Sequence, residues 1–463
     1  MPYRKLKSVL NVLAVVLLII VALALFAGVG YIVYDVLTND TSRGIVIVTA
    51  LLSGGLITTD EDGTESVIWD PIPIDEFPIQ EILSTDGSLD VNLALESVTK
   101  AFNASGQNMF STLFNLFDNL EVVAETGESV LNVRPANMSD STHAKYGVLN
   151  VYKETFDMFE ERYGDKAEVS VFNYDWRLDN ERNAELLEKY INEKGYDEVV
   201  LTSHSMGGNV VAGYLARSAE NREKVKLYCA YAPSLLGSVD ALAYLEDPSL
   251  VLDMLGALNL GAFQSVVEQL VSNIAGPLLR SMPSIAQLLP SPYLMTSAQY
   301  SEELPMITVD GKAIETPEEL IEFYCSRPWT VTESGEKAYM FQTEDNGKTR
   351  LENFFDSVYV ETENGKVHST ELVNTVYFVG TGVSGKERAE FVTDPVSGEI
   401  VLSKTYTSTR GDNMVLEYSA TAGKGISGDN VAVYRGSGHH VVGIKFKDVL
   451  MKRTFAETDK VLA

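Results

Sequence analysis

The sequence predicts an α/β fold, in which a mostly parallel β-sheet carries helices on both faces. Short β-branched runs alternate with helical patterns along much of the chain, which is how parallel strands and their crossover helices are arranged in sequence. One of these runs breaks directly into a helix at a serine with small neighbours. The chain has 463 residues, of which 45% are hydrophobic, so it is long enough and apolar enough to bury a substantial core.

The composition limits the classes of partner and of covalent framework. A net charge of −29 argues against nucleic acid or an anionic membrane surface as an electrostatic partner. The two cysteines, Cys229 and Cys325, form no disulfide framework. A single disulfide between them stays open, but Cys229 lies in a strand-like run that favours a buried apolar thiol. The sequence does not indicate protein partners or the oligomeric state.

The N-terminus predicts a membrane anchor. Three basic residues at positions 4–7 precede an uncharged, largely apolar run at 8–34. This run exceeds the roughly 20 residues that span a bilayer as a helix, and a cleaved signal peptide has a shorter apolar region. We therefore expect residues 1–37 to be a basic end and an uncleaved transmembrane signal anchor, with a removed signal peptide as the alternative. The positive-inside rule then places residues 38–463 outside the cytoplasm, on a single-pass protein of the cell membrane.

Four elements are predicted between the anchor and the serine. They are a buried strand at 44–48, an amphipathic helix at 147–163, a strand at 167–174 and a helix at 183–193. The strands are predicted from unbroken apolar runs, which are typical of parallel strands covered on both faces. Apolar residues at helical spacing predict the helices, and glycines follow them closely.

The stretch around Ser205 predicts a nucleophile elbow, the strand–turn–helix of the α/β-hydrolase fold. An apolar run at 199–202 precedes the serine, and a small-residue helical pattern at 210–216 follows it. Ser203 and Gly207 flank Ser205 at i−2 and i+2, where a sharp turn requires small side chains. The usual pattern has glycine in place of Ser203. A serine- and glycine-rich loop between a core strand and a helix is the structural alternative.

Two backbone N–H groups are predicted to form an oxyanion hole beside this serine. The first belongs to Met206, which follows the nucleophile at the start of the helix. The second is expected in the glycine-containing loop at 49–56, after the first strand, and by position we assign it to Leu51. An ordinary exit from a strand into a loop explains the same residues.

Two insertions are predicted in the hydrolase domain, at about 72–140 and 235–330. The second lies between the predicted strands at 225–231 and 375–382 and contains long apolar helical stretches. It is too long for a connection and too apolar for a solvated loop. A helical cap over the active site fits best, because a substrate with long apolar chains needs an apolar cover.

The acid of a catalytic triad is predicted from chain order, because this fold arranges the triad as serine, acid, histidine. Asp412 and Asp429 are the candidates. Asp412 follows the strand at 375–382 and a polar hairpin around 394–398. Asp429 directly precedes the strand at 431–434, so we expect it at the opposite end of the sheet. We therefore favour Asp412.

The triad histidine is predicted in the loop after the last strand. Of five histidines in the chain, His439 and His440 follow the candidate acids. They lie in a glycine- and serine-containing loop, from which an imidazole can reach back over the sheet end. His440 is favoured because apolar residues follow it directly, and His439 remains the alternative.

Several stretches together resemble the lecithin:cholesterol acyltransferase family of the α/β-hydrolase superfamily, which includes lysosomal phospholipase A2. The matching stretches are Tyr174-Asp175-Trp176-Arg177, the Ser205 elbow, Ala232-Pro233 with Leu236-Gly237-Ser238, Arg280-Ser281-Met282-Pro283-Ser284 with Leu288-Leu289-Pro290, and Gly411-Asp412 with Val415. The chain looks like a bacterial-type, membrane-anchored member. It departs from the family at Ser203 in place of glycine, at Thr49-Ala50-Leu51 in place of a Pro-Gly start, and at Asn413-Met414 in place of Gly-Thr.

The resemblance implies acyl chemistry on a lipid ester, by a lipase, phospholipase or O-acyltransferase. Ser205 would attack the carbonyl carbon, with His440 as general base and Asp412 holding the imidazole. The acyl-serine intermediate would pass to water or to a lipid alcohol, and neither a metal nor an organic cofactor is required. The substrate would be a phospholipid or glycerolipid at a membrane or micelle interface.

The resemblance also implies that Asp175, Trp176 and Arg177 lie near the site and support it. A buried Asp–Arg pair that braces the end of the sheet is the alternative. Two other functions remain open: a carboxylesterase for short soluble esters, and an anchored module that kept the fold without the chemistry. The apolar insertion argues against the first, and the retained order of serine, acid and histidine argues against the second.

Overall fold

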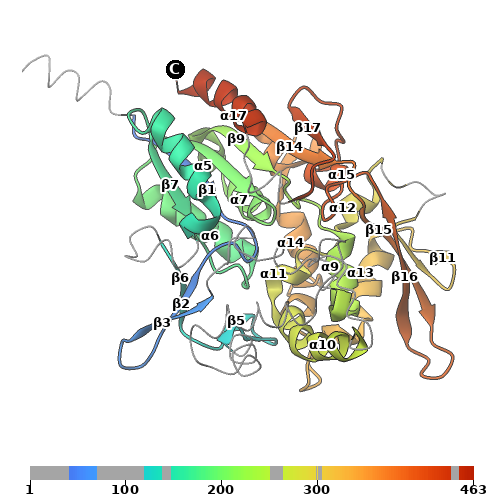
Figure 1. Cartoon of the computed structure of the whole chain (residues 1–463). Coiled ribbons are helices and arrows are strands. Elements are labelled where there is room, and N and C mark those ends of the chain that lie inside the picture. The colour runs from blue at the N-terminus through green and yellow to red at the C-terminus, as the bar shows by residue number, and fades with distance from the viewer. Residues whose placement is uncertain are drawn as a thin grey trace, which may run out of the picture. The chain divides into compact units, whose positions relative to one another are not determined.

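The computed structural model describes residues 41–69, 119–137, 148–250, 264–298, 300, 305–439 and 448–462 (Figure 1). The predicted anchor, most of the first predicted insertion and His440 lie outside these ranges. No helix within them is long and apolar enough to cross a membrane. Contacts divide the chain into Met1–Arg43 and Gly44–Ala463, and the fold described below is that of the second unit.

The strands are β1 Arg43–Val48, β2 Leu56–Thr59, β3 Glu65–Trp69, β4 Val122–Val123, β5 Glu128–Ser129, β6 Val133–Pro135, β7 Glu168–Phe172, β8 Glu198–His204, β9 Val225–Tyr231, β10 Ile307–Val309, β11 Lys312–Ala313, β12 Tyr359–Thr362, β13 Gly365–His368, β14 Thr375–Thr381, β15 Gly385–Thr393, β16 Ile400–Ser408 and β17 Val431–Arg435. The α-helices are α5 Val148–Tyr163, α6 Asn180–Glu193, α7 Gly207–Arg217, α8 Ala219–Lys224, α9 Val239–Glu246, α10 Gln264–Ser281, α11 Pro283–Ala286, α12 Pro292–Met295, α13 Pro317–Cys325, α14 Arg350–Ser357, α15 Glu417–Ala420 and α17 Asp448–Val461. Short 3₁₀ helices are η4 Pro328–Thr330, η5 Tyr339–Phe341 and η6 Ser369–Leu372.

A six-stranded sheet in the order β17-β14-β9-β8-β1-β7 forms the centre of this unit. The pairs β1–β7, β8–β9, β9–β14 and β14–β17 are parallel. The predicted α/β fold with a central parallel sheet is therefore confirmed. From β1 the chain moves outward to β7 and then returns to β8 on the other side of β1. In open parallel sheets, sites form at the carboxyl ends of the two strands where the order reverses, here β1 and β8.

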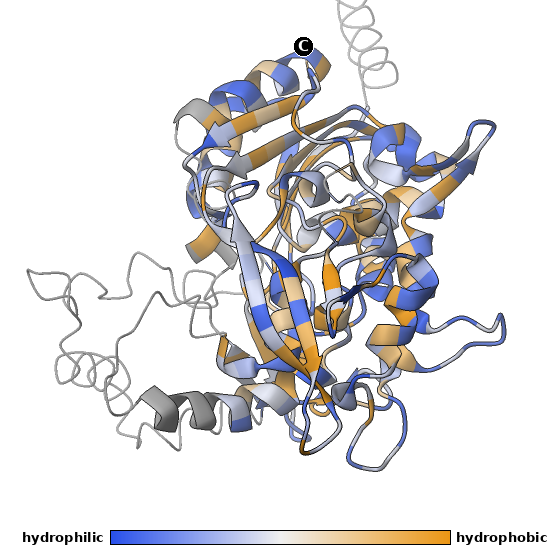
Figure 2. Ribbon diagram, turned by 90° about the vertical axis from the view of Figure 1, so that its right-hand side faces the viewer, coloured by the Kyte–Doolittle hydropathy of each residue, from blue (hydrophilic) through white to orange (hydrophobic). Residues whose placement is uncertain are grey.

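Alternation along the strands supplies apolar side chains to both faces of the sheet. Ile45 and Ile47 of β1 join a buried cluster with side chains of α5 and α17. Val46 and Val48 join a second cluster with side chains of α6 and α7. Side chains at successive strand positions point to opposite faces, so an unbroken apolar run serves two helical layers. Figure 2 shows the central strands as largely hydrophobic, whereas the outer helices carry hydrophilic residues on part of their surface.

Both cysteines are free thiols: Cys229 is fully buried in β9, and Cys325 at the end of α13 is partly exposed.

The insertion between β9 and β14 is larger and more varied than the helical segment predicted at 235–330. The described elements from α9 through η6 all lie between these two strands of the central sheet. Strand β10 pairs in parallel with β15, and β16 completes a four-stranded sheet in the order β11-β10-β15-β16. The hairpin predicted around 394–398 connects β15 and β16, but its pairing with β10 was not foreseen. Residues 251–263 of the predicted insertion lie outside the described ranges.

The insertion packs onto the carboxyl-terminal end of the central sheet. Ser284 of α11 donates its hydroxyl to the carbonyl of Arg177, at 3.2 Å. Ser238, before α9, donates its hydroxyl to the carbonyl of Met414, at 2.6 Å. Gly237, which directly precedes Ser238, has φ +78°. A Cβ at this position would lie 2.1 Å from the carbonyl oxygen of Leu289. Glycine thus permits the two segments of the insertion to approach closely above the sheet end.

Candidate active site

Ser205 lies in a sharp turn between β8 and α7, with φ at +52°. Its N–H donates to the carbonyl of Tyr231 at 3.0 Å, and its own carbonyl accepts from the N–H of Gly208 at 2.9 Å. A positive φ at a non-glycine residue costs of order 1–3 kcal/mol of conformational free energy. Such a residue persists only where the surrounding structure imposes this backbone conformation. The turn is the strand-to-helix geometry that the sequence predicts.

Small residues allow neighbouring strands to approach this turn. A Cβ at Gly207 would lie 2.4 Å from the carbonyl oxygen of Thr49, so glycine lets the end of β1 contact the start of α7. Ser203 stands where the usual elbow pattern has glycine. Its hydroxyl lies 2.6 Å from that of Tyr228 on β9, and this hydrogen bond accommodates the buried serine.

Asp412 is held in a loop attached to the carboxyl end of β14. Its Oδ1 accepts hydrogen bonds from the N–H groups of Met414 (3.1 Å) and Val415 (2.8 Å). Asn413 adopts φ +78°, a conformation that asparagine tolerates better than most residues, so it can stand where the family has glycine. Asp412 is 1% exposed and directs its Oδ2 toward a histidine.

That histidine is His439, whose Nδ1 lies 2.8 Å from Asp412 Oδ2. The backbone N–H of His439 also donates to the carbonyl of Asp412 (2.8 Å) and to Oδ1 of Asn413 (3.2 Å). These bonds hold the loop after β17 against the loop that carries Asp412. The sequence favoured His440, which lies outside the described residues, so the Asp–His pair in the structure is made with the alternative histidine.

The competing acid, Asp429, is exposed and lies at the opposite end of the sheet. Its neighbour Asn430 accepts a hydrogen bond from the N–H of Tyr377 and donates from its amide to the carbonyl of Thr375, the first residue of β14. Asp412, in contrast, is joined to Val383, just past the other end of β14. This is the arrangement expected from the order of the strands.

His439 lies next to the turn that carries Ser205. Its ring centroid is 4.9 Å from that of His204, which directly precedes Ser205. Within the described part of the chain, no hydrogen bond joins the Ser205 hydroxyl to His439. Because Asp412 engages Nδ1 of His439, Nε2 is the nitrogen that can act as a base toward Ser205.

The predicted oxyanion donors lie on two segments that Gly207 brings together. Met206 caps the start of α7, and Leu51 lies in the turn after β1. Neither backbone N–H donates to any residue that the structure describes. The turn is closed by a hydrogen bond from the N–H of Ser53 to the carbonyl of Ala50, at 3.3 Å. Both N–H groups thus lie just past the carboxyl ends of two strands, β1 and β8.

Side chains from other parts of the chain hold the loop that carries Leu51. Trp69 donates its indole N–H to the carbonyl of Leu52 at 2.8 Å, and Trp176 donates to that of Gly54 at 3.1 Å. The two rings pack edge to face, with centroids 5.5 Å apart. These contacts hold the loop in place. The Leu51 N–H then needs no rearrangement during a reaction, which is what a preorganised oxyanion hole requires.

The predicted supporting residues divide into two roles. Trp176 contacts the loop after Leu51, as described above. Asp175 and Arg177 form a buried ion pair, in which Nη2 of Arg177 lies 2.7 Å from Oδ2 of Asp175. Arg177 also donates from Nη2 to the hydroxyl of Ser129 at 2.9 Å. This buried pair has the contacts expected of the structural alternative, a brace at the end of the sheet.

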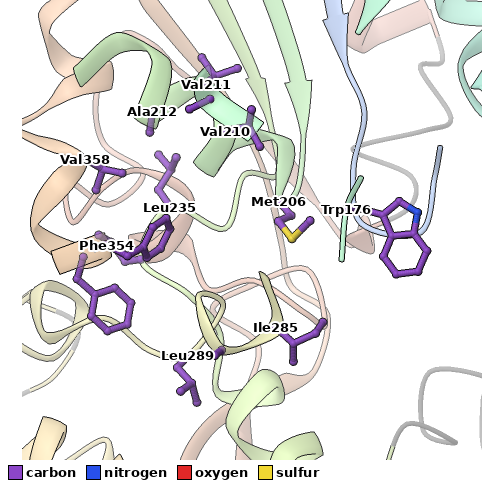
Figure 3. Close-up of a cluster of buried hydrophobic side chains, with 14 of the residues drawn as sticks. Trp176, Met206, Val210, Val211, Ala212, Leu235, Ile285, Leu289, Phe354 and Val358 are labelled. Carbon is purple, nitrogen blue, oxygen red and sulfur yellow. The ribbon is translucent and has the colours of Figure 1, made fainter. Parts of the chain in front are cut away.

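An apolar cluster surrounds the elbow (Figure 3). Met206 and the start of α7 contribute to it, together with Trp176 and, from the inserted segment, Ile285 and Leu289. In the described ranges, no group of three or more His, Cys, Asp or Glu side chains is placed to hold a metal ion.

Sequence reasoning missed Tyr152 and Ser53, whose hydroxyls contact each other and the backbone of Ala50. Tyr152 was counted only as part of the apolar face of the helix at 147–163. No local pattern distinguishes a packing tyrosine from one whose hydroxyl meets a loop about one hundred residues away.

Comparison with known proteins gives one family match. Residues 106–303 match the family described as Lecithin:cholesterol acyltransferase, so the resemblance predicted from the sequence is confirmed over this range. No curated protein matches the chain.

Three solved structures are similar at low identity. "The crystal structure of Tle4-Tli4 complex" matches at 16% identity with a TM-score of 0.49, covering 91% of this chain and 99% of that one. Carboxylesterase CesB (YbfK) from Bacillus subtilis matches at 9% identity with a TM-score of 0.26, covering 90% and 84%. A soluble variant of monoglyceride lipase from Saccharomyces cerevisiae, in complex with a substrate analog, matches at 10% identity with a TM-score of 0.25, covering 92% and 87%.

Proposed function

The chain resembles the lecithin:cholesterol acyltransferase family over residues 106–303, and from this premise we propose that it is an acyl hydrolase or O-acyltransferase acting on lipid esters. The proposed triad is Ser205, His439 and Asp412. The observation that carries it is the buried 2.8 Å contact between Asp412 and His439, beside a serine held at positive φ.

In the acylation step, His439 Nε2 takes the proton from Ser205 Oγ while that oxygen attacks the ester carbonyl carbon. Asp412 holds Nδ1–H of the imidazole and stabilises the imidazolium that forms. The oxyanion develops next to the N–H groups of Met206 and Leu51. The hydrogen bond between serine and histidine in such a triad often tightens only when substrate binds, and we expect it to form between Ser205 Oγ and His439 Nε2 in the complex with the ester.

Acylation ends when His439 gives its proton to the departing alcohol, which leaves the acyl group on Ser205 Oγ. In the second step the acyl group is transferred: the same nitrogen takes a proton from water or from a lipid alcohol as that acceptor attacks the acyl carbon. The bond to Ser205 Oγ then breaks, and His439 returns the proton to this oxygen. Hydrolysis and acyl transfer differ only in the acceptor.

Preference for long acyl chains is the expected consequence of an apolar insertion that packs over the sheet end. Each buried methylene is worth about 0.8 kcal/mol, or about fourfold in affinity. Rates of ester hydrolysis should therefore rise with acyl length until the binding region is filled. Initial rates of the full-length protein on p-nitrophenyl esters of two to sixteen carbons, each below its micelle concentration, measure this preference. A maximum at two to four carbons would instead support the alternative, a carboxylesterase for short esters.

We also propose that residues 8–34 anchor the protein in the cell membrane, with the hydrolase domain outside the cytoplasm. The basic residues before the run support this orientation, because Lys and Arg are enriched on the cytoplasmic side of a membrane span. Protease added to intact cells should then remove an epitope placed after Ala463, while a cytoplasmic marker stays intact. An epitope that is digested only after lysis would contradict the orientation.

A further inference from the structure

The hydroxyl of Tyr152 meets both segments that form the candidate oxyanion hole. Tyr152 lies on α5 and is 1% exposed. Its hydroxyl accepts from the N–H of Ala50 at 3.0 Å and lies 3.0 Å from the hydroxyl of Ser53. On the other side it lies 3.5 Å from Nδ1 of His204, the residue before the nucleophile. One buried polar atom thus joins the loop after β1 to the end of β8.

Hydrogen bonds to Ala50 fix the orientation of the Leu51 N–H. The Ala50 carbonyl and the Leu51 N–H belong to the same peptide group, which is planar. The hydroxyl of Ser53 donates to that carbonyl at 2.8 Å and accepts from the Ala50 N–H at 2.7 Å. Holding Ala50 at both its N–H and its carbonyl therefore fixes the direction in which the Leu51 N–H points.

Tyr152 connects this turn to the body of the fold. Ser53 lies within the loop and would move with it, whereas Tyr152 comes from a helix 99 residues further along the chain. Burial raises the pKa of Tyr152 to about 12, so the phenol stays protonated at neutral pH. A protonated phenol can donate one hydrogen bond while it accepts others, as this position requires.

We infer that Tyr152 is a positioning residue for the oxyanion hole, which acts by fixing the Ala50–Ser53 turn and through it the N–H of Leu51. The hydroxyl of Tyr152 contacts Ala50, Ser53 and His204, so it acts through the turn. The inference deepens the proposed function and rests on it, because an oxyanion hole has a role only if Ser205 attacks an ester.

The test is Tyr152→Phe in the full-length protein, which removes the hydroxyl and keeps the ring packed under the sheet. We expect kcat on p-nitrophenyl butyrate to fall about 10- to 100-fold, with KM changed less than about twofold, because losing a whole oxyanion donor costs about 10²–10³-fold. The inhibition constant of an alkyl trifluoromethyl ketone should rise by the same factor as kcat falls. This ketone forms a tetrahedral adduct with the serine, and the oxygen of the adduct occupies the oxyanion hole.

Tyr163→Phe is the matched control. Tyr163 lies three turns further along the same helix, and its hydroxyl lies within hydrogen-bonding distance of Oδ1 of Asp459 (2.9 Å) and of the carbonyl oxygen of Phe455 (3.2 Å), away from the loop. If α5 hydroxyls serve stability alone, both variants should lower the melting temperature and leave kcat unchanged. We expect that pattern for Tyr163→Phe only.

A second variant tests the route through the turn. Ser53→Ala should lower kcat as Tyr152→Phe does, and the double variant should lose no more than the larger single effect, because both act on the same turn. A Tyr152→Phe enzyme within twofold of the wild-type kcat, or an unchanged inhibition constant for the ketone, would overturn the inference while the proposed function stands. A wild-type protein without any ester hydrolysis would overturn both.

Discussion

The Ser205→Ala variant is expected to lose ester hydrolysis by about 10⁶-fold, to the level left by binding and the oxyanion hole. The reason is that Ser205 supplies the oxygen that forms the acyl-enzyme bond, and no neighbouring group replaces it. The variant should fold normally, because alanine fills less volume at a position that is only partly buried. Rates on a soluble p-nitrophenyl ester, with the melting temperature measured in parallel, check both statements.

Ser234→Ala is the control for this experiment. Ser234 is 2% exposed and its N–H contacts the carbonyl of Ser205 at 3.3 Å, but its hydroxyl has no hydrogen-bond partner among the described residues. Turnover in this variant should stay within about twofold of wild type. Turnover that survives in Ser205→Ala, at a rate comparable with this control, would remove Ser205 from the mechanism.

The alanine variants of the two adjacent histidines, His439 and His440, should differ in kcat by several orders of magnitude. His439→Ala is expected to reduce kcat nearly as much as Ser205→Ala, because triad members act as a unit. Asp412→Asn should cost about 10⁴-fold, since an amide at this position favours the wrong imidazole tautomer. His440→Ala should change kcat less than about fivefold. The measurement is kcat for the three variants on one ester.

The opposite ranking of the histidine variants would contradict this assignment. If His440→Ala lost activity and His439→Ala kept it, the contact between His439 and Asp412 would be structural. The base would then be the histidine that the sequence favoured.

The position of Asp412 could be predicted because it follows from strand order. Asp412 and Asp429 have the same neighbours in sequence, Gly on one side and Asn on the other. They differ in which end of the sheet they reach, and that depends only on whether each follows or precedes its strand. Parallel strands all run in one direction, so the sequence alone indicates which end of the sheet each aspartate reaches.

The choice between adjacent histidines was not predictable in the same way. Both lie in one glycine-containing loop, and their order relative to the strands is identical. The pairing of His439 depends on its N–H, which is held by the carbonyl of Asp412 and the side chain of Asn413. These bonds join residues 26 and 27 positions apart, and no local pattern in either segment specifies them.

The loop that carries Leu51 could likewise not be predicted in detail. Leu51 was assigned by its place after the first strand, and the structure puts it in a turn beside the elbow helix. The groups that fix the loop come from distant segments: Trp69, Tyr152 and Trp176 all meet it through hydrogen bonds to backbone atoms. Such bonds depend on tertiary packing, which periodicity does not encode.

The inserted segment was predicted as helical because periodicity is a local signal. The pairing of β10 with β15 joins residues about eighty positions apart, Ile307 with Ala389. Strands of three residues are too short for a pattern of alternation to reveal them.

Active-site labelling of the full-length protein with a fluorophosphonate, followed by peptide mapping, tests the central claim most directly. A fluorophosphonate reacts with a serine whose hydroxyl is activated by a neighbouring base, and it leaves a stable adduct. We predict one adduct, on Ser205, with labelling strongly slowed in His439→Ala and absent in Ser205→Ala. An adduct on a different serine, or no adduct on the folded protein, would contradict a nucleophile at Ser205 and with it the proposed activity.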